Sequence, residues 1–174
     1  MGDLRAFGIT VDLPRGWDGR IYRRAPAPAS RAVGAVAAGA EVTDLAADEG
    51  TVQPVAHLAN FPLPADRGDY GSGAVERMGP GHVLVCLLEF DSEAADTALF
   101  AHDGVPTFAP SSFAPNAMQR TIQGMSGAQA FFRASGRAFC AYAVLGSHRD
   151  RVALTPRVNE LMATVRIEDL GPSR

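Results

Sequence analysis

The sequence predicts a single domain of the α+β class, in which helices cover an antiparallel sheet. Its 174 residues lie within the size range of one domain, and the 47% that are hydrophobic are enough to form a core. Patterns typical of strands follow one another along the chain, whereas helical patterns are few and do not alternate with them. A helical spacing near the C-terminal end indicates a helix that closes the domain.

The N-terminal region predicts a hairpin of two strands. Residues 7–13 alternate apolar and polar side chains, which is typical of a strand buried on one face. A Pro-Arg-Gly turn ends this strand, and residues 20–24 have the pattern of a return strand. Because Asp18-Gly19 between them is a common hairpin dipeptide, we expect the two strands to pair with each other.

The stretch over residues 25–50 differs in composition from the rest of the chain. It is rich in Ala, Gly and Pro, it starts with Ala-Pro-Ala-Pro, and it ends on an acidic run. Its middle, residues 33–42, is compatible with a weak edge strand, but the apolar side chains there are small and irregularly spaced. We therefore expect residues 25–50 to form a mobile insert in the single domain 1–174.

The middle of the chain predicts two strands separated by a short helix. Residues 52–63 have a strand pattern that ends at prolines. Ser72 is a suitable N-cap for a helix over 72–78, which Gly79 and the following proline would end. The nearly continuous apolar run 82–90 is typical of a central strand that is covered on both faces.

The C-terminal half predicts a loop, a hairpin and a helix. Residues 91–125 lack a regular period and contain three prolines, which indicates an irregular packed loop. Residues 128–145 give the strongest hairpin pattern of the chain, two aromatic-rich strands around a Ser-Gly-Arg turn. Thr155 and Pro156 are typical of an N-cap and a first helical turn, so the last helix is expected to begin there.

The charge of the chain and its cysteines indicate which partners and which cellular compartment to expect. The formal net charge is −3, and no basic patch of the kind that binds nucleic acid is visible. All sixteen basic residues are arginine, which excludes mechanisms that need a lysine. No leader pattern and no run of about eighteen apolar residues is seen, so membrane insertion is not expected. Cys86 and Cys140 lie in apolar runs and predict buried free thiols in the cytoplasm, with a structural disulfide as the alternative.

The sequence contains no recognisable catalytic, cofactor or metal motif. The four histidines lie in separate elements, without the close spacing of a metal-binding motif. Ser72 and Ser126 both miss the Gly-x-Ser-x-Gly spacing of a nucleophile elbow, and the apolar neighbours of Cys86 are typical of an inert interior thiol. We therefore predict no catalytic residue, no cofactor and no metal, and we favour a protein that is not an enzyme.

Two groups of side chains have the composition of a protein interface. The larger combines aromatic and arginine residues, which are enriched at interfaces: Trp17, Arg20, Tyr22, Arg23 and Arg24. Asp69 and Tyr70, just before the expected short helix, form a smaller candidate. The alternative interpretation of the larger group is a solvent-exposed strand face with one anchoring tryptophan.

The two ends of the chain resemble one known family. Residues 7–17, Phe-Gly-Ile-Thr-Val-Asp-Leu-Pro-Arg-Gly-Trp, are similar to the opening strand and Gly-Trp turn of Mog1/PsbP-like domains. The long strands over 128–145 and a helix over about 151–164 that leads into residues 165–167 are similar to the end of those domains. The resemblance implies a central antiparallel sheet of about six strands flanked by a few helices. It also implies non-enzymatic binding roles, which in this family include accessory subunits, a GTPase-binding protein and effector chaperones.

These observations favour a non-enzymatic protein-binding or adaptor domain, either a chaperone or a component of a larger assembly. A small-molecule-binding or hydrolytic role in a cleft near 91–127 is an alternative, because irregular loops packed over sheets often form binding sites. A structural homo-oligomer that pairs through exposed edge strands is a third possibility.

Overall fold

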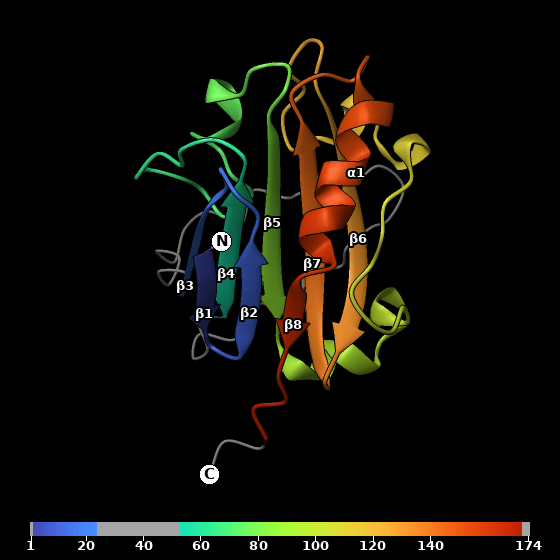
Figure 1. The fold of residues 1–174 in the computed structure, drawn as a ribbon. Helices are drawn as coiled ribbons and strands as arrows, with labels where there is room; N and C mark the ends of the chain where they lie inside the picture. Colours follow the sequence, from blue (N-terminus) through green and yellow to red (C-terminus); the bar gives the residue numbers. More distant parts are fainter. Residues whose placement is uncertain (1, 24–52, 172–174) are drawn as a thin grey trace, which may run out of the picture.

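The computed structural model describes residues 2–23 and 53–171, and it has an α+β fold that is mostly sheet (Figure 1). The described strands form two antiparallel sheets. The larger has five strands in the spatial order β3 (Asp18–Arg23), β4 (Pro54–Ala59), β5 (Val83–Phe90), β7 (Arg137–Leu145) and β6 (Ser126–Ala134). The smaller has three strands in the order β1 (Gly2–Ala6), β2 (Ile9–Leu13) and β8 (Val165–Ile167). The structure thus has two sheets, whereas a single sheet of about six strands was expected. The insert expected over 25–50 lies outside the described residues.

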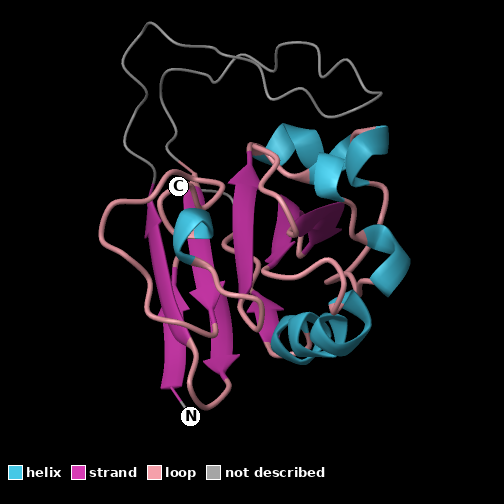
Figure 2. Ribbon diagram, turned by 90° about the horizontal axis from the view of Figure 1, so that it is seen from above, coloured by secondary structure: helices cyan, strands magenta, loops and turns pink. Residues whose placement is uncertain are grey.

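The helices cover the sheets from outside. Those in the described part of the chain are α1 (Arg151–Met162) and the short 3-10 helices η1 (Val75–Arg77), η2 (Ser92–Asp96), η3 (Ala98–Phe100), η4 (Pro110–Ser112) and η5 (Pro115–Ala117). The smaller sheet and α1 lie over one face of the larger sheet (Figure 1). Seen from above (Figure 2), most helical segments, in cyan, lie outside the strands, in magenta. Among the described helices, none combines the length and the apolar character that a membrane span requires.

The predicted pairing of the two N-terminal strands is wrong. The strand over 7–13 is observed as β2, but it forms its hairpin with β1, which precedes it. The turn is Phe7-Gly8, whose φ angles of 52° and 69° match those of a two-residue turn between twisted strands. Asp18 and Gly19 belong to β3, which pairs with β4 in the other sheet. The prediction failed because Phe-Gly makes the turn that was assigned to Asp-Gly.

The central strand and the long hairpin are confirmed. β5 is the middle strand of the larger sheet, and its residues are buried on both faces almost to its end. Val85 packs into the core under the smaller sheet and α1, whereas its neighbour Cys86 packs into a second core on the opposite face. The hairpin over 128–145 is observed as β6 and β7, joined by Ser135-Gly136, both with positive φ. The larger sheet therefore has a core on each face.

The last helix starts earlier than predicted. It begins at Arg151, and the hydroxyl of Thr155 donates from within the helix to the carbonyl of Arg151 at 2.6 Å. Pro156 consequently lies inside α1. The earlier start follows from a hydrogen-bonded turn over residues 147–150 that leads into the helix. The range of about 151–164 that the resemblance implied is closer to the observed bounds.

The two elements that precede the central strand in the chain are shorter than predicted. The strand expected over 52–63 is observed as β4. The helix expected over 72–78 is reduced to η1, which has Ala74 at its N-cap. The reason is that Gly71 and Gly73 have φ values of 78° and 90°, so the chain in front of η1 turns sharply.

The stretch over 91–125 packs as predicted, although it contains η2 to η5. Phe100, Phe108 and Phe113 in this stretch are buried. Two isolated β-bridges, one from Asp103 and one from Ala114, attach the stretch to the outer edge of β6. The stretch therefore covers part of a sheet edge that would otherwise be open to pairing with a second chain.

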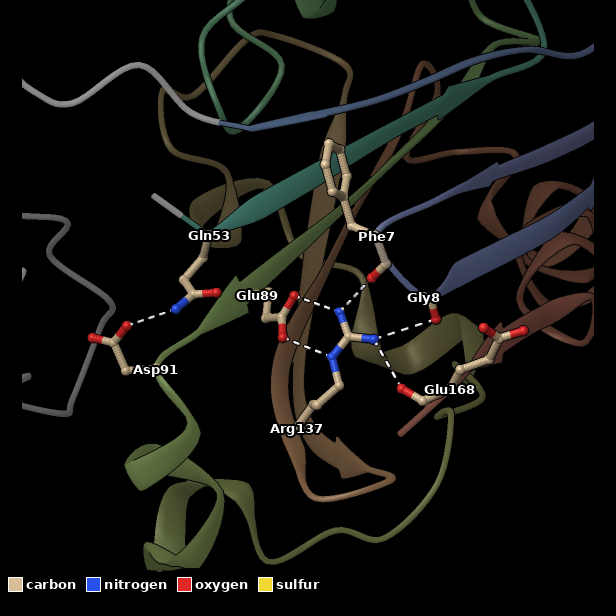
Figure 3. A network of polar contacts seen from close by, with 7 residues as sticks. All are labelled: Phe7, Gly8, Gln53, Glu89, Asp91, Arg137 and Glu168. Atoms are coloured by element: carbon tan, nitrogen blue, oxygen red, sulfur yellow. Dashed lines mark hydrogen bonds and ion pairs between the residues drawn. The ribbon is translucent and has the colours of Figure 1, made fainter. Parts of the chain in front are cut away.

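Arg137 joins the two sheets. Its guanidinium donates two hydrogen bonds of 2.7 Å to the carboxylate of Glu89 and three more to the carbonyl oxygens of Phe7, Gly8 and Glu168 (Figure 3). The side chains of this ion pair are only 7% and 8% exposed. All five N–H donors of the guanidinium thus have acceptors, as a buried charge requires. The contacts tie the β1–β2 turn and the end of β8 to the larger sheet.

Candidate functional site

A pocket of ≈ 630 Å³ opens on the face of the larger sheet that lies away from α1. The segment before and within η1 forms one wall: Gly68, Asp69, Tyr70, Ser72, Val75 and Glu76. The segment after η5 forms the other wall, with Tyr142 at the base: Met118, Gln119, Arg120, Ile122 and Tyr142. Segments that are distant in the sequence therefore meet over the middle of β7.

Tyr142 forms an aromatic base for the pocket. It is 1% exposed, and its ring lies edge-on to that of Tyr70, with 5.5 Å between the ring centroids. Its hydroxyl oxygen accepts a hydrogen bond of 3.1 Å from the backbone N–H of Gln119. Burial raises the pKa of Tyr142 to about 12, against the opposing effect of that hydrogen bond. The base of the pocket is therefore aromatic and uncharged at neutral pH.

An ion pair connects the two walls at the rim of the pocket. The guanidinium of Arg120 donates to Glu76 Oε1 at 3.2 Å, and these side chains are 73% and 40% exposed. Glu76 Oε2 accepts a hydrogen bond of 2.6 Å from the backbone N–H of Gly73. The turn in front of η1 thus orients the carboxylate, while the guanidinium reaches it from the opposite wall.

A buried histidine supports the first wall from behind. His57 on β4 is fully buried; Arg67 Nε lies 3.0 Å from its Nδ1, and the carbonyl oxygen of Asp69 lies 2.7 Å from its Nε2. Because the guanidinium can only donate and the carbonyl can only accept, the geometry requires a neutral ring with its proton on Nε2. Burial lowers the pKa of His57, opposed by the hydrogen bond to Asp69. A neutral His57 therefore anchors the backbone that lines the pocket.

The structure separates three of the predicted interface residues on and before β3. Trp17 packs against the core under the smaller sheet. Arg20 pairs with Asp18 at 2.8 Å, and Arg23 lies over the ring of Phe7, 5.0 Å from its centroid. Since alternate side chains of a strand point to opposite faces, these residues do not share one patch.

The remaining predicted residues lie at or near the pocket, apart from Arg24, which lies outside the described residues. Asp69 and Tyr70 line the pocket itself. Tyr22 packs edge-on against His57, with 5.3 Å between the ring centroids. The pocket thus includes the smaller predicted group, and Tyr22 of the larger group packs against the histidine that supports the first wall.

Sequence reasoning did not single out Glu76, Arg120 or Tyr142. The two rim residues lie 44 positions apart, and neither stands in a motif of its own. The pairing register places Tyr142 opposite Cys86, and Cys86 opposite His57, across β7, β5 and β4. A row of cross-strand neighbours was therefore readable once the strand order was known.

The neighbouring thiol is not set up as a nucleophile. Cys86 and Cys140 are buried and form no disulfide, as predicted. Burial raises the pKa of the Cys86 thiol, and the nearby Cys140 adds to this effect. A thiolate is the reactive form of cysteine, so this environment disfavours covalent chemistry. Across the described ranges, the acidic, histidine and cysteine side chains form no group of three that could hold a metal ion.

Comparisons with known proteins assign no family to this chain. No protein-family model matches the chain, and no curated protein or solved structure matches it at a significant level. The role of the chain therefore has to be argued from the residues around the pocket.

Proposed function

We propose that this chain is a non-enzymatic protein-binding domain that takes a side chain of its partner into the pocket over Tyr142. The observation that carries the proposal is the combination of an aromatic base with an oriented, charged rim. Binding pockets typically pair an apolar surface with a few placed polar groups, and tyrosine and arginine are enriched where proteins meet. The pocket has both properties.

The state of the neighbouring reactive groups supports binding over catalysis. Both ring nitrogens of His57 are engaged by Arg67 and Asp69, so the ring has no free nitrogen to act as a general base. Burial raises the pKa of Cys86, which keeps this thiol protonated. The histidine and the thiol behind the pocket are thus set up neither as a general base nor as a nucleophile.

The proposal retains the resemblance to Mog1/PsbP-like domains. The α+β fold with antiparallel strands and a closing helix supports it, while the separate three-stranded sheet departs from the single sheet that it implied. Within this class, an adaptor, a chaperone and a component of a larger assembly are alternative roles. Two buried cysteines without a disulfide favour a reducing compartment, so we place the protein in the cytoplasm.

A small-molecule-binding role is the second candidate. The volume of ≈ 630 Å³ lies within the range of sites for such ligands, which is about 300–1,000 Å³. Residues 118–122 of the second wall also belong to the cleft region near 91–127 that the sequence predicts. Native mass spectrometry of the purified protein separates the two roles, because a retained small molecule adds a defined mass.

A pocket-blocking variant tests the proposed function. Gln119 is exposed and lines the pocket, and its backbone N–H donates to the hydroxyl of Tyr142. In the Gln119→Trp variant an indole fills the pocket, and we expect at least about tenfold weaker capture of partner proteins from the native lysate. The matched control is Gln123→Trp, an exposed glutamine outside the lining. Equal capture by both variants, with equal thermal stability, would contradict the proposal.

A further inference from the structure

We infer that the pocket recognises an arginine side chain of the partner protein, whose guanidinium exchanges with that of Arg120 on Glu76. This inference rests on the proposed protein-binding function and specifies the chemistry of the partner. It follows from the charge of the pocket, from the exposed ion pair at its rim and from its aromatic base.

The charge of the pocket favours a cation. Two of its lining side chains, Asp69 and Glu76, carry carboxylates, and one, Arg120, carries a guanidinium. An anionic ligand would have to displace Glu76 from Arg120 and remain beside two carboxylates. A cationic ligand meets one like charge, that of Arg120, and two carboxylates of opposite charge.

The ion pair at the rim shows how the carboxylate of Glu76 binds a guanidinium. Glu76 is oriented by its hydrogen bond from Gly73, and it keeps this bond whichever cation it pairs with. Arg120 is 73% exposed and contacts Glu76 at 3.2 Å, the geometry of a weak surface pair. An incoming guanidinium therefore replaces a weak contact, and the released Arg120 moves into solvent at little cost.

The rest of the pocket favours arginine over lysine. The half-buried ring of Tyr70 provides aromatic surface, on which a planar guanidinium stacks better than an ammonium does, and Tyr142 packs edge-on against that ring. Met118 and Ile122 provide apolar surface for the aliphatic part of the side chain. A guanidinium can also bond a carboxylate through two parallel N–H groups, which a lysine cannot do.

Two peptides that differ in one charge test the inference. The probe is acetyl-Gly-Gly-Arg-Gly-Gly-amide, and its control carries citrulline, the neutral isostere, in place of arginine. Titration into the isotopically labelled protein should shift the backbone amide signals of residues 68–76 and 118–122. We expect the citrulline peptide to bind about tenfold more weakly, since a hydrogen bond to a charged group is lost. A lysine peptide should bind with intermediate affinity.

Variants of the rim give opposite expected signs. Glu76→Gln should weaken binding of the arginine peptide by about tenfold, whereas Arg120→Gln should strengthen it several-fold by removing the internal competitor. Glu93→Gln and Arg149→Gln, exposed residues outside the pocket that change the net charge equally, should leave the affinity unchanged.

Three results would overturn the inference. Equal binding of the arginine and citrulline peptides, weaker binding after Arg120→Gln, or no shift at the pocket with any peptide would each do so. None of them decides the proposed function, because the effect of Gln119→Trp on partner capture is measured separately.

Discussion

Two ion pairs on opposite faces of the larger sheet differ in their surroundings. Arg137 and Glu89 are 7% and 8% exposed, and the remaining donors of the guanidinium bond backbone carbonyls of the smaller sheet and the C-terminal segment (Figure 3). Arg120 and Glu76 are 73% and 40% exposed and join two loops. The first pair cannot be separated without leaving a charge in the core, whereas the second can exchange its partner with water or a ligand. Burial, and not the type of residue, thus separates a structural pair from one suited to binding.

The largest effect is expected from breaking the buried pair. Glu89→Gln leaves the charge of Arg137 uncompensated in the core, and we expect the free energy of unfolding to fall by about 3–5 kcal/mol. Urea unfolding followed by circular dichroism measures this loss. Glu93→Gln, which changes the charge of an exposed residue, should alter it by less than about 0.5 kcal/mol. A loss below about 1 kcal/mol for Glu89→Gln would show that the core tolerates an unpaired Arg137.

A second, smaller effect is the pH dependence of the free energy of unfolding that comes from His57, behind the pocket wall. In the unfolded chain His57 titrates near its ordinary pKa of 6.5, whereas burial lowers its pKa in the folded protein. The unfolded chain therefore takes up a proton at a pH where the folded protein does not. The stability that His57 contributes is complete above about pH 6.5 and is lost as the pH falls toward the lower folded pKa.

Unfolding experiments at about pH 7.5 and 5.5 measure this contribution. We expect a lower free energy of unfolding at the acidic pH and a smaller pH difference in His57→Gln, which has no titrating ring. His102→Gln, at an exposed histidine, should keep the pH difference of the parent protein. The same difference in all three proteins would mean that His57 does not supply the pH dependence.

The fold was predictable where the signal is local. The apolar run of β5 and the Ser135-Gly136 turn of the long hairpin were located correctly, because strand period and turn chemistry are read from adjacent residues. The division into two sheets was not predictable. It depends on β2 pairing with β8, for example Ile9 with Ile167, across almost the whole chain. Local patterns carry no information on such a pairing.

The site was predictable only in part, for the same reason. Asp69 and Tyr70 were identified from their place just before the expected short helix. The other wall comes from residues 118–122, in a stretch with no periodic pattern, so nothing local marked Arg120. The pair of Arg137 and Glu89 was missed as well, since Arg137 was assigned to the turn of the hairpin and Glu89 to the apolar run of the central strand.

The smallest effect on stability is expected at the rim of the pocket. Arg120→Gln and Glu76→Gln should each change the free energy of unfolding by less than about 1 kcal/mol, because exposed ion pairs contribute little and glutamine can still accept from Gly73. The double variant isolates the coupling between the two side chains, which should lie between about 0 and 1 kcal/mol. A coupling of several kcal/mol would make this pair as structural as that of Arg137 and Glu89. Exchange of Arg120 for an arginine of a partner would then cost more than the new contact returns, because the displaced guanidinium would leave a stabilising position.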